Sequence, residues 1–307
     1  MSKTFYSNGK LLLTGEYVVL DGAQALAIPT VYGQSLVVAK GDKNGINWQS
    51  LDYENNIWLE TFISGESLRN YIKNKNLTSP EERLIQILAE AQQLNPNFLK
   101  DNFQYKVTTH LDFPRNWGLG TSSTLINNIA EWAEIDAYEL LKNTFGGSGY
   151  DIACAKNNTP ILYQIKHDKP EVKQVKFQPD FEDHIFFIYL NQKRNSRDAI
   201  ASYKNQPKTA LNRVKTAITD LTYEILECDN LSGFENLLKT HENLLSKLIN
   251  SPTVQSILFS DYNSGIVKSL GGWGGDFVMA TGTEEDMTYF KNKGYETIIP
   301  FSQMILK

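Results

Sequence analysis

The sequence has little cysteine and no excess of positive charge. Its 307 residues include only Cys154 and Cys228, which form no CxxC or Cys/His metal spacing, so we expect reduced thiols and no cysteine zinc site. The formal net charge is −5, with acidic and basic residues mixed along the chain. This excludes the clustered basic surface of a nucleic-acid-binding protein. A small anionic substrate stays compatible, because a local basic patch can oppose the net charge.

Long apolar runs are also missing. No stretch approaches the length of a membrane span, and residues 1–5 lack the apolar core of a signal peptide. We therefore expect a cytoplasmic protein with no membrane partner, and the sequence leaves a monomer and a homodimer open. Hydrophobic residues make up 41% of the chain and charged residues 21%, which suits a globular protein with a sizeable core.

Strand and helix patterns occur in both halves of the chain, which predicts an α+β fold. The clearest helix begins after Ser79, an N-cap residue followed by proline and two glutamates. Other helices are expected at 123–134, 211–225 and 234–248. Strands are expected at 11–13, 17–20, 34–40, 46–51, 57–63, 105–111, 184–190, 277–281 and 296–300. The polar stretch 166–183 predicts a boundary between two domains, 1–175 and 176–307.

A glycine-bearing loop, Gly118 to Ser123, stands between an expected strand and an expected helix. Glycines let the backbone approach a ligand, and a helix that starts directly after them points N–H groups at it. The hydroxyls of Thr121, Ser122 and Ser123 can donate to phosphate oxygens or hold magnesium. The loop has neither Walker nor Rossmann spacing. On these residues alone, a phosphate loop and a simple glycine turn with a serine N-cap both stay open.

Two charged residues would suit a phosphoryl-transfer site beside such a loop. Asp151 follows a second glycine loop, Gly146 to Gly149, and precedes an apolar segment where a carboxylate is costly without a partner. Lys10 stands directly before an apolar strand and is a candidate partner. An aspartate can orient or deprotonate an acceptor, and a lysine can stabilise charge on the transferring group. An ordinary ion pair is the alternative for these residues.

Four motifs, in order along the chain, resemble those of the GHMP kinases, the superfamily of galactokinase, homoserine kinase, mevalonate kinase and phosphomevalonate kinase. The motifs are Asn8 to Tyr17, Pro114 to Ser123, Gly147 to Ala153 and Lys268 to Asp276. Together they span most of the chain. The resemblance implies a two-domain GHMP kinase fold, with a ribosomal-protein-like N-terminal domain and a ferredoxin-like C-terminal domain.

The resemblance also implies ATP and Mg²⁺ as cofactors, with Lys10 and Asp151 as the catalytic pair. Ser122 and Glu139 would be magnesium ligands, although the spacing of Glu139 from Asp151 departs from the family pattern. Expected ATP-binding residues are Trp117, Gly118, Leu119, Gly120, Thr121, Ser122 and Ser123; packing is the alternative for Trp117. Expected substrate-binding residues are Glu16, Tyr17, Ser148, Gly149, Ser196, Arg197, Gly274, Gly275 and Asp276.

The acceptor stays open between phosphomevalonate and mevalonate. The triplet Gly15-Glu16-Tyr17 resembles phosphomevalonate kinases, whereas Lys193 to Arg197 resembles a motif near the mevalonate site of mevalonate kinases. We expect a kinase of the mevalonate pathway, and thus of isoprenoid biosynthesis. Asn8 and Trp273 replace the usual proline and glycine, and they are the best support for an alternative, a nucleotide-binding regulator with decayed catalysis. The retention of both Lys10 and Asp151 argues against this alternative. An ATP-dependent diphosphomevalonate decarboxylase is another alternative.

Overall fold

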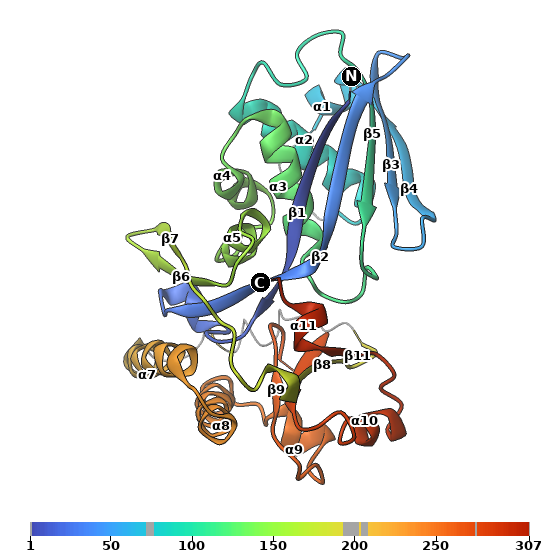
Figure 1. Ribbon diagram of the computed structural model, residues 1–307. Helices are drawn as coiled ribbons and strands as arrows, with labels where there is room; N and C mark the ends of the chain where they lie inside the picture. The colour runs from blue at the N-terminus through green and yellow to red at the C-terminus, as the bar shows by residue number, and fades with distance from the viewer. Residues whose placement is uncertain (1, 72–76, 193–202, 204–207, 274, 307) are drawn as a thin grey trace. The chain divides into compact units, whose positions relative to one another are not determined.

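The computed structural model describes residues 2–71, 77–192, 203, 208–273 and 275–306 (Figure 1). The chain forms two compact units that alternate along the sequence. The first unit comprises Met1–Gly9, Tyr32–Arg115 and Leu119–Lys156, and the second comprises Lys10–Val31, Asn116–Gly118 and Asn157–Lys307. Both units contain helices and strands, as the sequence pattern predicts. The division into domains 1–175 and 176–307 stays a prediction.

The sheet of the first unit contains β1 (Lys3–Leu12), β2 (Ala25–Lys40), β3 (Gly45–Leu51), β4 (Ile57–Ile63) and β5 (Gln104–Leu111). These include the strands predicted at 46–51, 57–63 and 105–111, whereas β1 and β2 begin eight or nine residues before the stretches predicted at 11–13 and 34–40. Strand β5 is antiparallel to β2 and parallel to β3, and β4 pairs antiparallel with β3. Strand β1 pairs with β2. Residues 10–12 of β1 and 25–31 of β2 belong to the second unit.

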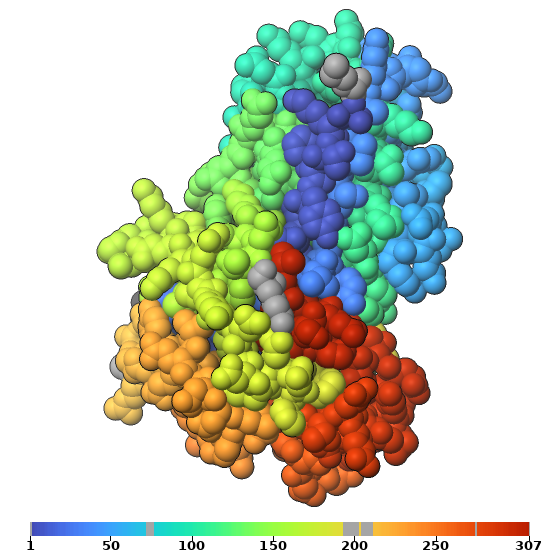
Figure 2. Space-filling view, in the orientation of Figure 1, coloured from blue at the N-terminus to red at the C-terminus, as the bar shows by residue number. Residues whose placement is uncertain are grey.

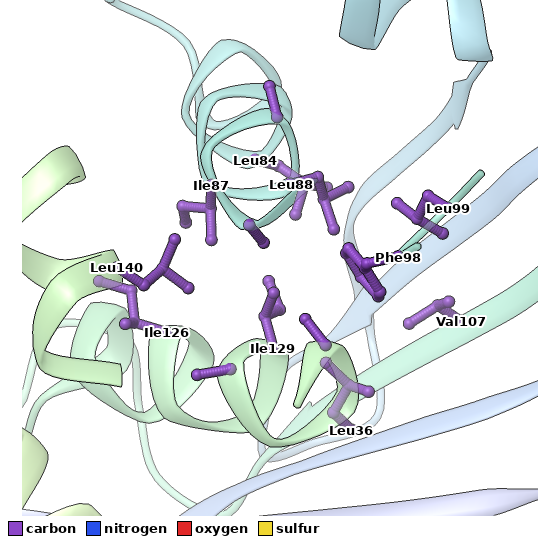
Figure 3. Close-up of a cluster of buried hydrophobic side chains, with 14 of the residues drawn as sticks. Leu36, Leu84, Ile87, Leu88, Phe98, Leu99, Val107, Ile126, Ile129 and Leu140 are labelled. Carbon is purple, nitrogen blue, oxygen red and sulfur yellow. The ribbon is translucent and has the colours of Figure 1, made fainter. Parts of the chain in front are cut away.

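Among its described residues, the first unit contains five helices. They are α1 (Gly65–Arg69), α2 (Pro80–Leu94), α3 (Thr121–Ala133), α4 (Ala137–Thr144) and α5 (Tyr150–Lys156). Leu88 of α2 and Ile126 and Ile129 of α3 point toward one another in the core that Figure 3 shows. All three are fully buried. Each such side chain contributes roughly 1.5–3 kcal/mol on burial, so this core fixes α3 against α2.

The predicted start of α2 is confirmed in detail. Ser79 Oγ accepts the backbone N–H of Glu82 at 3.1 Å, and the Glu82 carboxylate accepts the backbone N–H of Ser79 at 3.0 Å. Pro80 occupies the first helical position. This capping box satisfies N–H groups that would otherwise lack a partner, so the N-terminus of α2 is capped by its own side chains.

The second unit contains a four-stranded antiparallel sheet. Its order is β11 (Ile298–Pro300), β8 (Ile185–Tyr189), β10 (Phe277–Thr281) and β9 (Val267–Ser269). The two predicted long helices are confirmed as α7 (Lys208–Glu227) and α8 (Leu231–Ile249). Shorter helices are α9 (Val254–Leu258), α10 (Thr288–Asn292) and α11 (Phe301–Met304). A separate pairing joins β6 (Ile161–Lys166) to residues 25–27 of β2.

The strand predicted at 17–20 differs from the structure. Residues 18–20, expected in a strand, lie in the 3-10 helix η1 (Val18–Asp21), which ends at Gly22 with a φ of +81°. The polar stretch 166–183 contains the strand β7 (Lys169–Gln174), which pairs with β6; the domain boundary expected in this stretch stays a prediction. Every residue of β7 is exposed, and the strand lies at the surface in Figure 2. Its residues lack the apolar alternation by which a strand is recognised in a sequence. No helix in the described part of the chain is long and apolar enough to cross a membrane.

Candidate active site

The predicted site residues are divided between the two compact units. The first unit contains Leu119 to Ser123, Glu139, Ser148, Gly149 and Asp151. The second unit contains Lys10, Glu16, Tyr17, Trp117, Gly118, Gly275 and Asp276. The predictions for Ser196, Arg197 and Gly274 fall outside the described residues.

The predicted phosphate loop leads directly into α3. Gly120 is the N-cap of α3, and its φ of +97° lies in the left-handed region that favours glycine. No side chain caps this N-terminus, in contrast to the capped start of α2. Ser122 is exposed, whereas Ser123 is buried and donates its hydroxyl to the Gly120 carbonyl at 2.9 Å. The first turn of α3 thus presents backbone N–H groups and the Ser122 hydroxyl, which suit an anionic ligand.

A buried polar network holds the start of α3 in place, and sequence reasoning missed it. Thr124 Oγ1 donates to Gln34 Oε1 on β2 at 2.7 Å, and Asn128 Nδ2 donates to the Gln34 carbonyl at 2.8 Å. Ser7 Oγ on β1 donates to Asn128 Oδ1 at 2.8 Å. Polar groups inside a core are costly unless bonded, so these pairings specify one position for the helix. The only signal in the sequence is the run of polar residues on an otherwise apolar helix.

Asp151 lies in the first turn of α5 and is half-buried. Its Oδ1 accepts the backbone N–H of Ile152 at 3.1 Å. Gly149, directly before the helix, has a φ of +87°. Cys154, three positions further along α5, is fully buried. Helix α3 packs against both α4 and α5, so Thr121 to Ser123 and Asp151 lie on neighbouring helices of the first unit.

The candidate magnesium ligands are hard oxygen donors. Ser122 in the first turn of α3 and Glu139 in the first turn of α4 are both exposed. Within the described residues, no group of three or more His, Cys, Asp or Glu side chains could hold a metal ion. Magnesium usually keeps several waters and binds through one or two carboxylates plus substrate phosphates. An exposed hydroxyl and an exposed carboxylate suit a magnesium ion that is bound mainly through nucleotide phosphates. Magnesium binding by Ser122 and Glu139 stays a prediction.

Lys10 and Asp276 both approach Gly118 within the second unit. Lys10 Nζ donates to the Gly118 carbonyl at 2.7 Å. Gly118 has a φ of +69°, and a Cβ atom at this position would overlap the Asp276 carboxylate. Asp276 itself has a φ of +52°, and its backbone is held by hydrogen bonds to Leu190 and Gln192. The close approach of the Asp276 carboxylate therefore leaves room only for glycine at position 118.

The structure gives Trp117 an aromatic packing role. Its ring contacts Phe277 edge-on, with 5.4 Å between ring centroids, and lies 6.4 Å from the ring of Tyr189. Packing was the alternative to nucleotide contact for this side chain, and these contacts favour it. Binding of ATP by Trp117 stays a prediction.

Glu16 and Tyr17 are buried, and both are hydrogen-bonded to residues of the last glycine motif, Lys268 to Asp276. Glu16 Oε1 accepts from Lys268 Nζ at 2.5 Å, and Tyr17 OH accepts the backbone N–H of Trp273 at 3.0 Å. The Trp273 side chain is also buried, and its Nε1 donates to the Pro252 carbonyl at 2.8 Å. The tryptophan that replaces a family glycine therefore fills a hydrophobic cluster of the second unit.

Two further titratable side chains, His241 and Glu242 of α8, are buried near Glu16 and Lys268. His241 Nε2 accepts the backbone N–H of Gly15 at 3.1 Å, and burial, with the charge of Lys268, holds the pKa of His241 well below its usual value. Burial raises the pKa of Glu242 to about 7, and Glu16 adds to this effect while Lys268 opposes it. Burial also raises the pKa of Glu16, against the opposing charge of Lys268. Sequence reasoning gave no role to Lys268 or Glu242.

No model of a known protein family matches the chain, and no curated protein matches it. Solved structures do match. One is a mevalonate kinase, with 16% identity, a TM-score of 0.71 and coverage of 99% of this chain and 100% of that chain. Lactococcus lactis galactokinase complexed with galactose has 12% identity, a TM-score of 0.70 and coverage of 99% and 93%. Streptococcus pneumoniae phosphomevalonate kinase in complex with phosphomevalonate and AMPPNP has 17% identity, a TM-score of 0.66 and coverage of 97% and 99%. These likenesses confirm the fold that the four motifs predicted, and the chain has the two-domain GHMP kinase fold.

Proposed function

We propose that this protein is an ATP-dependent kinase that transfers the γ-phosphoryl group to a small anionic acceptor of the mevalonate type. The observation that carries the proposal is the uncapped start of α3 directly after Gly120, on a loop whose Gly118 carbonyl is bonded to Lys10. An uncapped helix N-terminus with a hydroxyl in its first turn suits a nucleotide phosphate. The GHMP kinase fold supports the same assignment.

The roles proposed for the side chains follow from charge and position. Lys10 stabilises negative charge on the acceptor oxygen and the transferring group, as electrostatic catalysis of phosphoryl transfer requires. Asp151 orients the acceptor and takes the proton of an alcohol acceptor. Magnesium, when bound with the nucleotide, neutralises phosphate charge, and Ser122 and Glu139 are the proposed oxygen donors to it.

Phosphomevalonate is the acceptor we favour, with mevalonate second. The solved complex of Streptococcus pneumoniae phosphomevalonate kinase holds phosphomevalonate and AMPPNP, and it matches this chain over nearly its whole length. Tyr17 in the first motif points to the same acceptor. A mevalonate kinase matches as well, with a slightly higher TM-score, which is why the alcohol is kept as the second acceptor.

One assay decides between these functions: ADP release by the purified protein with mevalonate, phosphomevalonate, diphosphomevalonate, homoserine and sugars. ADP release with one of the first two acceptors alone supports the proposal. Carbon dioxide release from diphosphomevalonate would show a decarboxylase instead. Nucleotide binding with no ADP release across the whole panel would show a regulator, and the kinase assignment would then fail.

A further inference from the structure

Glu16 and Lys268 form an ion pair that is closed to solvent. Lys268 Nζ lies 2.5 Å from Glu16 Oε1, and the two side chains are 0% and 1% exposed. The same Nζ donates to the Ser269 carbonyl at 2.8 Å and lies 3.6 Å from Glu242 Oε1. A buried ion pair adds little net stability, because desolvation offsets the attraction between the charges. We therefore expect the ion pair to matter more for the conformation that it favours than for the free energy of unfolding.

The pair belongs to a segment that is bonded at three consecutive residues. Gly15 donates its backbone N–H to His241 on α8, Glu16 binds Lys268, and Tyr17 OH accepts the backbone N–H of Trp273. Each bond reaches a different part of the second unit: a helix, a strand and a glycine-rich loop. All three bonds are buried, so the segment has little freedom to shift by itself.

Glu16 and Lys268 belong to the two motifs that also contain the candidate site residues Lys10 and Asp276. Glu16 follows Lys10 by six positions, and Lys268 opens the motif that ends at Asp276. Lys10 is bonded to the Gly118 carbonyl, and the Asp276 carboxylate lies against the same glycine. Within the second unit, these contacts and the Glu16–Lys268 pair therefore join the same two stretches of chain, Lys10 to Glu16 and Lys268 to Asp276, at both of their ends.

We propose that Lys268 is a positioning residue that, through Glu16, keeps the Lys10 segment and the last glycine motif in register for phosphoryl transfer. This inference rests on the proposed function. Glu16 and Lys268 are buried and act through their neighbours. A misplacement of about 1 Å at reacting groups can lower a rate by about 10²-fold, so loss of the pair should reduce kcat.

The decisive variant is the double substitution Glu16→Gln with Lys268→Met, which replaces the pair by neutral side chains of similar size. Lys268→Met alone would leave a buried carboxylate without its cation, which is strongly destabilising. We expect the double variant to fold, to lose at least tenfold in kcat, and to exchange the Trp273 amide hydrogen at least tenfold faster. The matched control is Lys166→Met with Glu171→Gln, an exposed ion pair of the same unit, which should change neither quantity.

Each outcome bears on the proposal. Wild-type kcat and wild-type exchange of the Trp273 amide in the double variant would overturn it. A raised KM for the acceptor with unchanged exchange would assign Glu16 to direct substrate contact and would also overturn it. If the double variant does not fold, Glu16→Gln alone must show both changes, since it leaves Lys268 bonded to the Ser269 carbonyl and near Glu242. If the wild-type protein releases no ADP, the proposed function has failed, and amide exchange alone decides whether the pair positions the motif.

Discussion

Lys10 Nζ donates a hydrogen bond of 2.7 Å to the Gly118 carbonyl, which joins the first candidate motif to the phosphate loop. The bond draws the ammonium group toward the backbone of the loop instead of toward bulk solvent. A lysine held in this way is oriented before a nucleotide arrives, and a preoriented charge is what electrostatic stabilisation of a transition state needs.

Lys10→Ala and Asp151→Asn should each lower kcat by about two orders of magnitude or more, the scale of electrostatic and acid–base contributions. The relative size of the two losses reports the acceptor. A phosphate acceptor is already ionised at neutral pH, so Asp151→Asn should then be the milder change. An alcohol acceptor needs its proton removed, so Asp151→Asn should then be at least as severe. Steady-state ADP release measures both, with melting temperature as the control for folding, and near-normal rates in either variant would contradict the proposed roles.

Gly118→Ala should destabilise the protein more than Gly271→Ala. Both glycines have a φ of +69°, so both substitutions carry the same backbone strain, roughly 1–2 kcal/mol. At Gly118 the new Cβ would also overlap the Asp276 carboxylate, whereas no atom lies within 4 Å at Gly271. Urea unfolding gives the free energy of unfolding of each variant. The difference between the two values reports the overlap with Asp276, because the backbone strain is common to both variants. Equal free energies of unfolding would show that Asp276 does not occupy this space.

Trp273→Gly, which restores the residue usual in the family, should destabilise this protein by about 3–5 kcal/mol, the range for removing a large buried aromatic side chain. The indole is 4% exposed and lies in the cluster around Tyr17 and Val18. Trp273→Phe keeps most of the packing and should lose only about 1 kcal/mol with the Nε1 hydrogen bond to Pro252. A fully stable Trp273→Gly variant would show that the side chain is not a core element. Thermal unfolding measures all three proteins.

Features encoded by neighbouring residues could be predicted from the sequence. The start of α2 depends on Ser79 and Glu82, three positions apart, and the bounds of β4 follow from its own residues. The candidate loop could be found in the same way, because its glycines and hydroxyls are contiguous. The Glu16–Lys268 pair joins residues 252 positions apart, and neither residue carries a local signal of burial or of its partner. The close approach of Asp276 to Gly118 is hidden for the same physical reason.

Burial of Glu242 should make the stability of the protein depend on pH. The pKa of Glu242 is about 7 in the folded state, compared with an ordinary value of 4.5 for the unfolded chain. Between pH 4.5 and pH 7, the folded protein therefore keeps a proton on Glu242 that the unfolded chain has lost. The stability contribution is then fully present below pH 4.5 and is lost as the pH rises through 7. The shift corresponds to about 3 kcal/mol.

Glu242→Gln imitates the protonated carboxyl and should remove this dependence. The free energy of unfolding of the variant, relative to the wild type, should therefore rise by about 3 kcal/mol between pH 4.5 and pH 8. His241 acts in the opposite sense, because its lowered pKa makes stability fall as the pH drops below 6.5. This contribution is common to both proteins and cancels in the difference. Urea unfolding at several pH values measures the effect, and the exposed substitution Glu171→Gln serves as the control. Parallel curves for wild type and Glu242→Gln would mean that Glu242 stays ionised in its buried position beside Lys268.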